Sequence, residues 1–441
     1  MKILFISLGC DKNLVDSEMM LGMLREHGYE FTDDEEQADI VVVNTCCFIN
    51  DAQEESIQVL LEMGQRRING EIKALIAAGC LAQRYKDEIR HEIPEVDAIV
   101  GTTAIDKIVS ALEHVLEGQG RDELDEVSRK PVTDQKRIVT TGGHYAYLKI
   151  AEGCDKHCTY CIIPKVRGDY RSVPMESLVR EAEQLAGSGV KELILVAQET
   201  TVYGVDLYGK KSLPELLRRL CGIRGLVWIR ILYCYPEEIT QELIDVIKEQ
   251  PKICHYLDIP IQHASDEILR RMGRRTDQAQ LMDIIHSLRQ QIPDICLRTT
   301  LITGFPGETD EQHKELMDFV SQMDFDRLGV FAYSPEEDTP AASFPDQIAE
   351  EVKQERRAQL MELQQDLAFS RAEGRVGERL LVMIEGKVAD ENAYVGRTYR
   401  DAPNVDGLIF VQTQEELMTG DLVKVCVSGS YEYDLIGEIE K

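Results

Sequence analysis

The alternation of short apolar strands with amphipathic helices limits most of this chain to an α/β fold. In the first hundred residues, strands are expected at Lys2–Leu8, Ile40–Asn44 and Lys73–Ala78, and each is followed by an expected helix. These helices cover Asp16–His27, Asp51–Arg67 and Tyr85–Glu92. This order predicts a doubly wound parallel sheet with helices on both faces. Ligands of such sheets bind beyond the carboxyl ends of the strands.

A second series of strands and helices occupies the middle of the chain. Its expected strands are Ala146–Ile150, Glu192–Val196, Trp228–Leu232, His255–Pro260, Cys296–Ile302 and Arg327–Ala332. Six such units predict an incomplete (β/α)6 barrel, whose active site would lie at the C-terminal rim of its strands. A long charged helix is expected to follow at Asp346–Arg375.

The end of the chain changes character to short strands separated by turn residues. The expected strands are Leu380–Glu385, Ala393–Thr398, Gly407–Val411, Leu422–Gly429 and Tyr433–Glu440. Five short strands in this length predict a small antiparallel β-barrel. The predicted domains are therefore 1–118, a polar linker at 119–142, a barrel domain at 143–375 and the small β-barrel at 376–441.

Charge and hydropathy limit the partners and the compartment. No stretch reaches the ~18 consecutive apolar residues of a membrane helix, and Ile3–Leu8 is shorter than the ~7–15 residues of a signal core. A cytoplasmic protein without a membrane partner is therefore expected. The net charge of −30 opposes binding to phosphate backbones, so direct nucleic-acid binding is not expected, and it attracts basic proteins. The alternative is that this charge serves only solubility.

Three of the twelve cysteines, Cys154, Cys158 and Cys161, lie on one short loop after an expected strand. In a reducing compartment such cysteines indicate metal binding, catalysis or core packing rather than disulfides. Three thiolates can bind three irons of a cubane cluster and leave the fourth iron open for a small molecule. Structural zinc normally takes four protein ligands, and no fourth one follows at zinc-finger spacing, although His157 lies inside the loop. Zinc stays as an alternative.

Three further cysteines, Cys10, Cys46 and Cys80, each follow an expected strand of the first sheet. Since parallel strands end at one edge, these thiols are expected to meet and to hold a second cluster. The alternative is that each is a small buried side chain. Cys47 would point elsewhere in an extended backbone. The remaining cysteines are interpreted as packing residues: Cys221, Cys234, Cys254, Cys296 and Cys426.

The spacing of Cys154, Cys158 and Cys161, with Tyr160 before the third cysteine, resembles the radical S-adenosylmethionine (radical SAM) superfamily. The whole chain resembles its methylthiotransferases, and the terminal barrel resembles a TRAM domain. The resemblance implies two 4Fe–4S clusters, one on this loop and one on Cys10, Cys46 and Cys80, with SAM on the open iron of the first. The cluster on the loop would cleave SAM to a radical. The second cluster would supply the methylthio group.

Within this family, three segments resemble the enzymes that modify the β-carbon of an aspartate in protein twelve of the small ribosomal subunit. They are residues 8–18 (LGCDKNLVDSE), 162–168 (IIPKVRG) and 401–407 (DAPNVDG). The implied partners are that basic protein, free or in the ribosome, and a low-potential electron donor such as a flavodoxin. Two alternatives remain: the same chemistry on an adenosine of transfer RNA, and a non-catalytic iron–sulfur electron carrier.

The terminal barrel gives a separate test of the substrate, because residues 377–441 contain thirteen acidic and six basic residues. A barrel used on RNA should be basic, whereas an acidic one suits a basic protein. The alternative is that the barrel is a solubilising lid.

Four residues near expected strand ends or in strands are candidate SAM contacts. Tyr160 would pack against the adenine, as the resemblance implies, and Glu199 would hold the amino group, as a comparable acidic loop does in related enzymes. Gln262 is expected to point toward the same mouth, and Arg298 suits a carboxylate contact. Glu199, Gln262 and Arg298 each also fit ordinary turn or rim chemistry.

Overall fold

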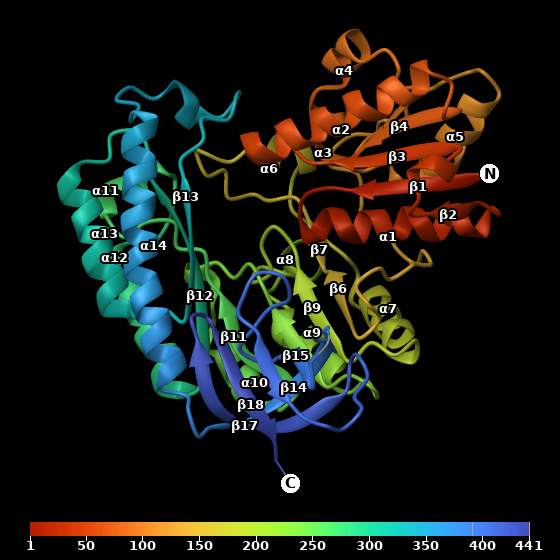
Figure 1. Ribbon diagram of the computed structural model, residues 1–441. Helices are drawn as coiled ribbons and strands as arrows, with labels where there is room; N and C mark the ends of the chain where they lie inside the picture. Colours follow the sequence, from red (N-terminus) through yellow and green to blue (C-terminus); the bar gives the residue numbers. More distant parts are fainter. Residues whose placement is uncertain (390, 441) are drawn as a thin grey trace.

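The computed structural model describes residues 1–389 and 391–440 of the chain. It contains an N-terminal parallel sheet, a central parallel sheet and a C-terminal barrel. In Figure 1 these parts lie at the upper right, in the middle and at the bottom.

The N-terminal sheet has five parallel strands in the order β2-β1-β3-β4-β5. The strands are β1 (Lys2–Ser7), β2 (Glu30–Thr32), β3 (Ile40–Thr45), β4 (Ala74–Ala78) and β5 (Ala98–Val100). The helices are α1 (Asp11–Glu26), α2 (Asn50–Ile68), α3 (Gly79–Arg84), α4 (Lys86–Glu92) and α5 (Ile108–Leu116). The predicted parallel sheet is confirmed. The edge strands β2 and β5 were missed because each has only three residues.

Helices cover both faces of this sheet because β3 is apolar on both sides. Val42 shares a buried cluster with Met20 of α1 and Leu112 of α5. The next residue, Val43, packs with Leu60 of α2 on the opposite face. Successive side chains of a strand point to opposite faces, so a continuous apolar run is what a doubly wound sheet requires.

The central sheet has six parallel strands in the order β13-β12-β11-β10-β9-β6. These are β6 (Tyr145–Lys149), β9 (Glu192–Val196), β10 (Trp228–Ile231), β11 (Ile253–Asp258), β12 (Cys296–Thr303) and β13 (Arg327–Ala332). In the described part of the chain, β6 and β13 are not paired, so the barrel stays open, as predicted.

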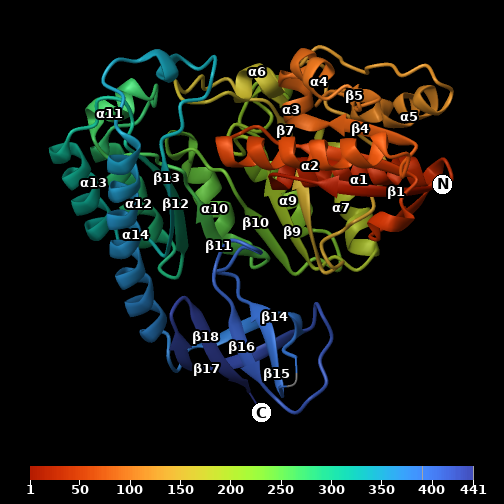
Figure 2. The same cartoon turned by 45° about the horizontal axis from the view of Figure 1, so that its top comes forward.

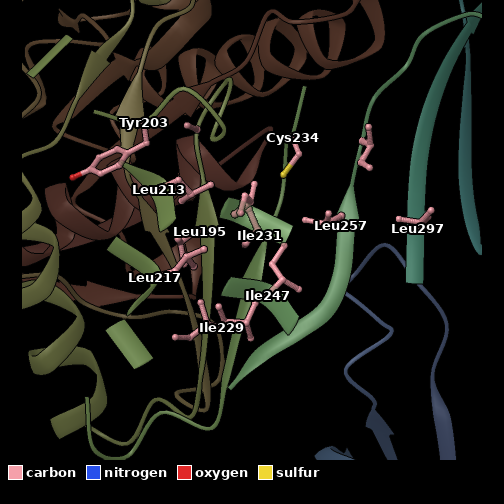
Figure 3. Close-up of a cluster of buried hydrophobic side chains, with 14 of the residues drawn as sticks. Leu195, Tyr203, Leu213, Leu217, Ile229, Ile231, Cys234, Ile247, Leu257 and Leu297 are labelled. Carbon is pink, nitrogen blue, oxygen red and sulfur yellow. The ribbon is translucent and has the colours of Figure 1, made fainter. Parts of the chain in front are cut away.

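Helices cover the outer face of this sheet. They are α7 (Met175–Gly187), α9 (Leu213–Cys221), α10 (Gln241–Glu249), α12 (Gln278–Gln291), α13 (Asp310–Met323) and α14 (Glu350–Glu373). Figure 3 shows part of this core, in which Ile231 and Leu257 of the sheet lie near Leu217 of α9 and Ile247 of α10. Short elements complete the domain: α6 (Ile163–Arg167), α8 (Val205–Tyr208), α11 (Asp266–Arg271), β7 (Ala151–Glu152) and β8 (Arg171–Ser172).

The other two parts of the chain cover the inner face of the central sheet. Tyr147 of β6 and Trp228 of β10 belong to the same buried cluster as Val15 of α1. The C-terminal barrel contributes Met383 and Ala402 to that cluster. Neighbouring domains therefore cover part of the inner face of the open barrel.

The C-terminal barrel is mixed, which corrects the expectation of an antiparallel one. Its strands close in the order β14-β15-β16-β18-β17. They are β14 (Arg379–Lys387), β15 (Ala393–Arg397), β16 (Ile409–Gln412), β17 (Leu422–Tyr431) and β18 (Asp434–Ile439). The β16–β18 pair is parallel. An odd number of strands around a closed ring cannot alternate direction throughout, so at least one neighbouring pair has to be parallel.

Residues 119–142, expected as a linker, run along the two α/β domains and pack against both. Arg137 is buried in this segment and lies 2.6 Å from Glu18 of α1 and 2.6 Å from Glu181 of α7. The domain boundaries remain a prediction. Among the described residues, no helix is long and apolar enough to span a membrane.

Candidate active site

Cys10, Cys46 and Cys80 lie at the carboxyl ends of β1, β3 and β4, which are neighbours in the sheet. The register pairs Ser7 with Asn44, and Asn44 with Ala78, so the three strands end level with one another. Two glycines make room at this edge. Gly9 has φ +88°, and a Cβ there would lie 2.7 Å from the Cys46 sulfur. At Gly79, with φ +90°, a Cβ would lie 2.2 Å from an Asn44 oxygen.

One buried side chain, Asn13, connects the three loops that carry these cysteines. Its amide nitrogen donates to the carbonyl of Leu8 at 3.0 Å and to the carbonyl of Thr45 at 2.9 Å. Its amide oxygen accepts from the Cys80 thiol at 3.6 Å. Asn13 lies in the segment 8–18, and no sequence pattern predicts this role for it.

Burial changes the pKa of the Cys46 and Cys80 thiols. It raises the pKa of Cys80, and the nearby guanidinium of Arg167 acts in the opposite direction. It also raises the pKa of Cys46. Cys47 is packed against the core beside Arg84, and burial raises its pKa to about 12. Because only thiolates bind iron, loading this site has to release protons.

Cys154, Cys158 and Cys161 lie on the loop that follows β6 and β7. The Cys154 amide donates to the carbonyl of Gly168 at 3.1 Å, and the Cys161 amide donates to the carbonyl of Cys158 at 3.0 Å. The loop is also fixed from outside, because the Thr159 amide donates to the carbonyl of Met272 after α11 at 2.9 Å. Burial raises the pKa of Cys154 to about 12.

Each set offers three thiol donors, which suits a cubane cluster with one iron left open. Among the described residues, no three His, Cys, Asp or Glu side chains converge closely enough to hold one metal ion. A structural zinc would need four donors at about 2.0–2.3 Å. In a cubane each thiolate binds a different iron, so three cysteines around a cluster lie farther apart than ligands of one ion.

Glu199, after β9, is brought against the Cys154 loop through Lys156. Its carboxylate lies 3.4 Å from the Lys156 ammonium and accepts from the Thr201 hydroxyl at 2.6 Å. Burial raises the pKa of Glu199 to about 7, and Lys156 opposes this shift. The buried Glu199 carboxylate already faces the ammonium of Lys156. It is therefore suited to bind the amino group of SAM, as the sequence predicts.

Tyr160 packs with Phe305 and Met272 beside the cysteine loop. Two further residues, Tyr235 and Arg274, lie beside the cysteine loop, and no sequence motif predicts them. The Tyr235 hydroxyl lies 3.8 Å from the Cys158 sulfur, and the Arg274 guanidinium lies 4.3 Å from the centre of the Tyr235 ring. They are far from the loop in sequence and follow no motif, so only the fold brings them there.

Gln262 lies at the same rim, with φ +72°, and its backbone amide donates to the carbonyl of Thr300 at 2.9 Å. Its buried side-chain oxygen and that of Gln198 have no hydrogen-bond partner among the described residues. Two nitrogens of Arg274 also lack a partner there. Buried polar atoms are normally paired, so these groups fit a polar ligand such as SAM.

Arg298 is not brought to the cysteine loop. It is the third residue of β12, and its side chain lies 3.7 Å from Asp258 and 3.4 Å from Asp406 of the C-terminal barrel. Its role as a SAM contact remains a prediction, and the geometry favours a role in docking the barrel.

The N-terminus of α1 contacts the rim of the central sheet. The Lys12 ammonium lies 3.4 Å above the ring of Tyr233, which follows β10. The Tyr233 hydroxyl donates to Asp11 at 3.3 Å. Residues next to Cys10 therefore touch the rim of the central sheet.

Comparison with known proteins agrees with this arrangement. Family models match at residues 2–101 (Uncharacterized protein family UPF0004), 148–320 (Radical SAM superfamily) and 376–439 (TRAM domain). The ribosomal protein uS12 methylthiotransferase RimO of Lachnoclostridium phytofermentans is 64% identical over 440 residues, covering 100% of both chains. The chain belongs to the RimO family of methylthiotransferases. The RimO of Clostridioides difficile is 48% identical over 442 residues, covering 100% of this chain and 99% of the relative.

The RimO family is thus a group of radical SAM enzymes, and membership implies SAM and a 4Fe–4S cluster. Among solved structures, the radical SAM methyltransferase TsrM from Kitasatospora setae aligns with a TM-score of 0.56 at 15% identity. The alignment covers 88% of this chain and 81% of TsrM. At that identity the match shows the shared fold alone.

Proposed function

We propose that this chain transfers a methylthio group to the β-carbon of an aspartate in ribosomal protein uS12. The full-length identity to relatives with that name supports the substrate. The observation that carries the proposal is the contact between the segments that carry the two sets of three cysteines. Ile162, directly after Cys161, is buried in the same cluster as Cys80, and α6 lies against α3 in both views (Figures 1 and 2).

In this proposal Cys154, Cys158 and Cys161 hold one 4Fe–4S cluster, and Cys10, Cys46 and Cys80 hold a second. When bound, these clusters and SAM supply the radical chemistry for an unactivated C–H bond and the sulfur to be transferred. Three of the four candidate residues, Tyr160, Glu199 and Gln262, would then share one site at the rim around the first cysteine loop, together with Gln198. The fourth, Arg298, would lie outside it.

The residues of the chain bind and orient SAM. Glu199, as a carboxylate, accepts hydrogen bonds from the amino group in place of those from Lys156. The free amide oxygens of Gln198 and Gln262 accept further donors, and Tyr160 offers an aromatic face. Cys154 and Cys158 are buried, and this burial would keep water from the reacting atoms.

A cation for the substrate aspartate is available at Lys12. This ammonium belongs to the residue two positions after Cys10, and it touches the central rim through Tyr233. It is paired with Asp11 at 2.9 Å, and its remaining donors suit a second carboxylate. Lys12 would therefore orient the aspartate side chain so that its β-carbon lies between the two cysteine sites.

Charge supports a basic protein as the partner. The whole chain carries −30, and the barrel has thirteen acidic against six basic residues. The reaction also needs a low-potential electron from outside, for which a flavodoxin-type donor is suited. A ribosomal substrate would place the reaction in the cytoplasm.

An anaerobic assay tests the proposal with reconstituted enzyme, SAM, a reductant and either purified uS12 or small subunits. Intact-protein and peptide mass spectrometry should find one methylthio group on an aspartate of uS12. Modification of bulk transfer RNA, with uS12 left unmodified, would overturn the assignment and favour the transfer-RNA alternative.

A further inference from the structure

Arg167 lies at the junction of the two cysteine sites and contacts residues from both sides. It ends α6, six residues after Cys161, and its side chain is 2% exposed. One guanidinium nitrogen lies 2.7 Å from Asp16 of α1 and 3.1 Å from Glu152, which comes two residues before Cys154. The other donates to the amide oxygen of Asn13 at 2.5 Å.

Asn13 carries this contact on to the second site. The same amide oxygen accepts from the Cys80 thiol, and the amide nitrogen donates to the carbonyls of Leu8 and Thr45. Leu8 lies two residues before Cys10, and Thr45 comes directly before Cys46. A continuous set of hydrogen bonds therefore runs from α6 through Arg167 and Asn13 to all three loops.

The charges around Arg167 balance. Lys149 is a second buried cation and pairs with both Asp16 and Glu152. Two cations thus face two carboxylates within a buried network, which is the condition under which buried charges are tolerated. The third side-chain partner of Arg167, Asn13, is uncharged.

We infer that Arg167 is a positioning residue for the second cluster, which it orients through Asn13 and whose reduced state it stabilises. This inference rests on the proposed function, since it needs a cluster on Cys10, Cys46 and Cys80. A reduced cluster carries one more negative charge than an oxidised one. A buried cation beside its thiolates favours that state and raises the reduction potential.

The experiment isolates the second cluster in the full-length chain by replacing Cys154, Cys158 and Cys161 with Ala. In this background, Arg167→Gln removes the cation and leaves Asp16 and Glu152 in excess. We expect the midpoint potential, measured by an EPR-monitored redox titration, to become more negative. The shift should lower the reduced-to-oxidised ratio by about tenfold at a fixed potential, which is 59 mV for one electron.

The matched control is Arg137→Gln. Arg137 is as buried as Arg167, with 3% of its side chain exposed, and it also pairs with α1, through Glu18. It contacts neither Asn13 nor a cysteine loop in the hydrogen bonds of the described residues. Arg137→Gln should destabilise the packing of α1 about as much as Arg167→Gln does, and it should leave the reduction potential of the cluster unchanged.

Two further variants separate charge from positioning. Asp16→Asn removes a negative charge beside Arg167, so it should shift the potential in the positive direction. Arg167→Lys keeps the charge but loses the planar fork that reaches both Asp16 and Asn13. It should keep the potential near that of the background and change the EPR line shape.

The outcomes distinguish this inference from the proposed function. A background chain without iron would overturn the second cluster and this inference with it. A background chain with iron, but equal potentials in Arg167→Gln and Arg137→Gln, would overturn only the inference. Loss of iron in Arg167→Gln with retention in Arg137→Gln would support the positioning role. A positive shift in Asp16→Asn would support the role of charge.

Discussion

Glu192 of the central sheet and Arg397 of the C-terminal barrel form a fully buried ion pair at 2.7 Å. The other oxygen of Glu192 lies 2.8 Å from Arg230, which in turn donates to the backbone carbonyls of Tyr399 and Thr398. The barrel is therefore docked on the central sheet by desolvated charges, rather than tethered to it. Removing one partner of a buried pair leaves an uncompensated charge.

Arg397→Ala should therefore destabilise the docked barrel by about 3–5 kcal/mol. Urea unfolding and limited proteolysis between the central domain and the barrel measure the effect. Arg379→Ala is the control within the same barrel, because Arg379 is exposed and pairs with Glu440 at the surface. That change should cost less than about 1 kcal/mol. Equal losses in the two variants would contradict the docking role of the Glu192 pair.

The same interface buries the start of the segment 401–407, while its middle stays exposed. Asp401 and Ala402 are buried, and Asp401 pairs with Arg327 of β13 at 2.5 Å. Val405 is 56% exposed. Deleting residues 377–441 would therefore uncover Glu192 and Arg230 as well as remove the barrel, so we expect that deletion to destabilise the central domain. Point substitutions on the exposed barrel surface test substrate binding without removing this interface.

Replacing the six cysteines of the proposed clusters should lower the iron content of the chain, whereas replacing the other cysteines should not. About eight irons per chain are expected for two 4Fe–4S clusters. Replacing Cys154, Cys158 and Cys161 with Ala should halve the iron and abolish SAM cleavage. Replacing Cys10, Cys46 and Cys80 should also halve it, but SAM should still be cleaved to 5′-deoxyadenosine without a methylthio product.

Cys47→Ala is the control for the cysteine variants, since Cys47 is adjacent to Cys46 and buried to a similar degree. It should keep all the iron. Iron analysis and chromatography of the SAM products measure both effects. Methylthiolation by a chain without Cys10, Cys46 and Cys80 would contradict the role of the second cluster.

Glu199 should make SAM binding depend on pH near neutrality. Its carboxyl pKa is raised to about 7, so the carboxylate that accepts from the SAM amino group forms as the pH rises through 7. The dissociation constant of SAM, measured anaerobically by calorimetry, should fall between pH 6 and 8. Glu199→Gln should weaken binding and flatten this dependence, whereas Glu176→Gln, at an exposed helix position, should leave it unchanged. A pH dependence that persists in Glu199→Gln would assign it to another group.

The sequence predicted the regular elements well because apolar periodicity is a local property. All six central strands lie within two residues of their expected bounds, and the cysteines at strand ends follow from topology. Asn13 and Arg167 were not given roles, because their contact joins residues 154 positions apart and leaves no periodic trace. The parallel β16–β18 pair was also missed, although closing a ring of five strands requires one.

Lys12 should matter for the substrate and not for SAM. Lys12→Met keeps the length and apolar stem of the side chain but removes the ammonium that would pair with the substrate carboxylate. A hydrogen bond to a charged group is worth about 1.5–3 kcal/mol, so the KM for uS12 should rise by about 10- to 100-fold. Uncoupled SAM cleavage and iron content should stay the same. Loss of iron along with activity would assign Lys12 to the support of Cys10 instead.

Raising the salt concentration should slow association with the substrate more than it slows the chemical step. A chain with a net charge of −30 attracts a basic protein through a field that reaches only ~8 Å at physiological ionic strength. Raising the salt concentration should therefore lower kcat/KM for uS12, because association slows, while kcat at saturating substrate changes little. Stopped-flow or competition assays between uS12 and bulk transfer RNA at several salt concentrations measure this. Transfer RNA carries the same sign of charge as the enzyme, so its weak binding should not strengthen at low salt. Tight binding of transfer RNA that weakens steeply as salt rises would reveal a basic surface and contradict the choice of a protein substrate.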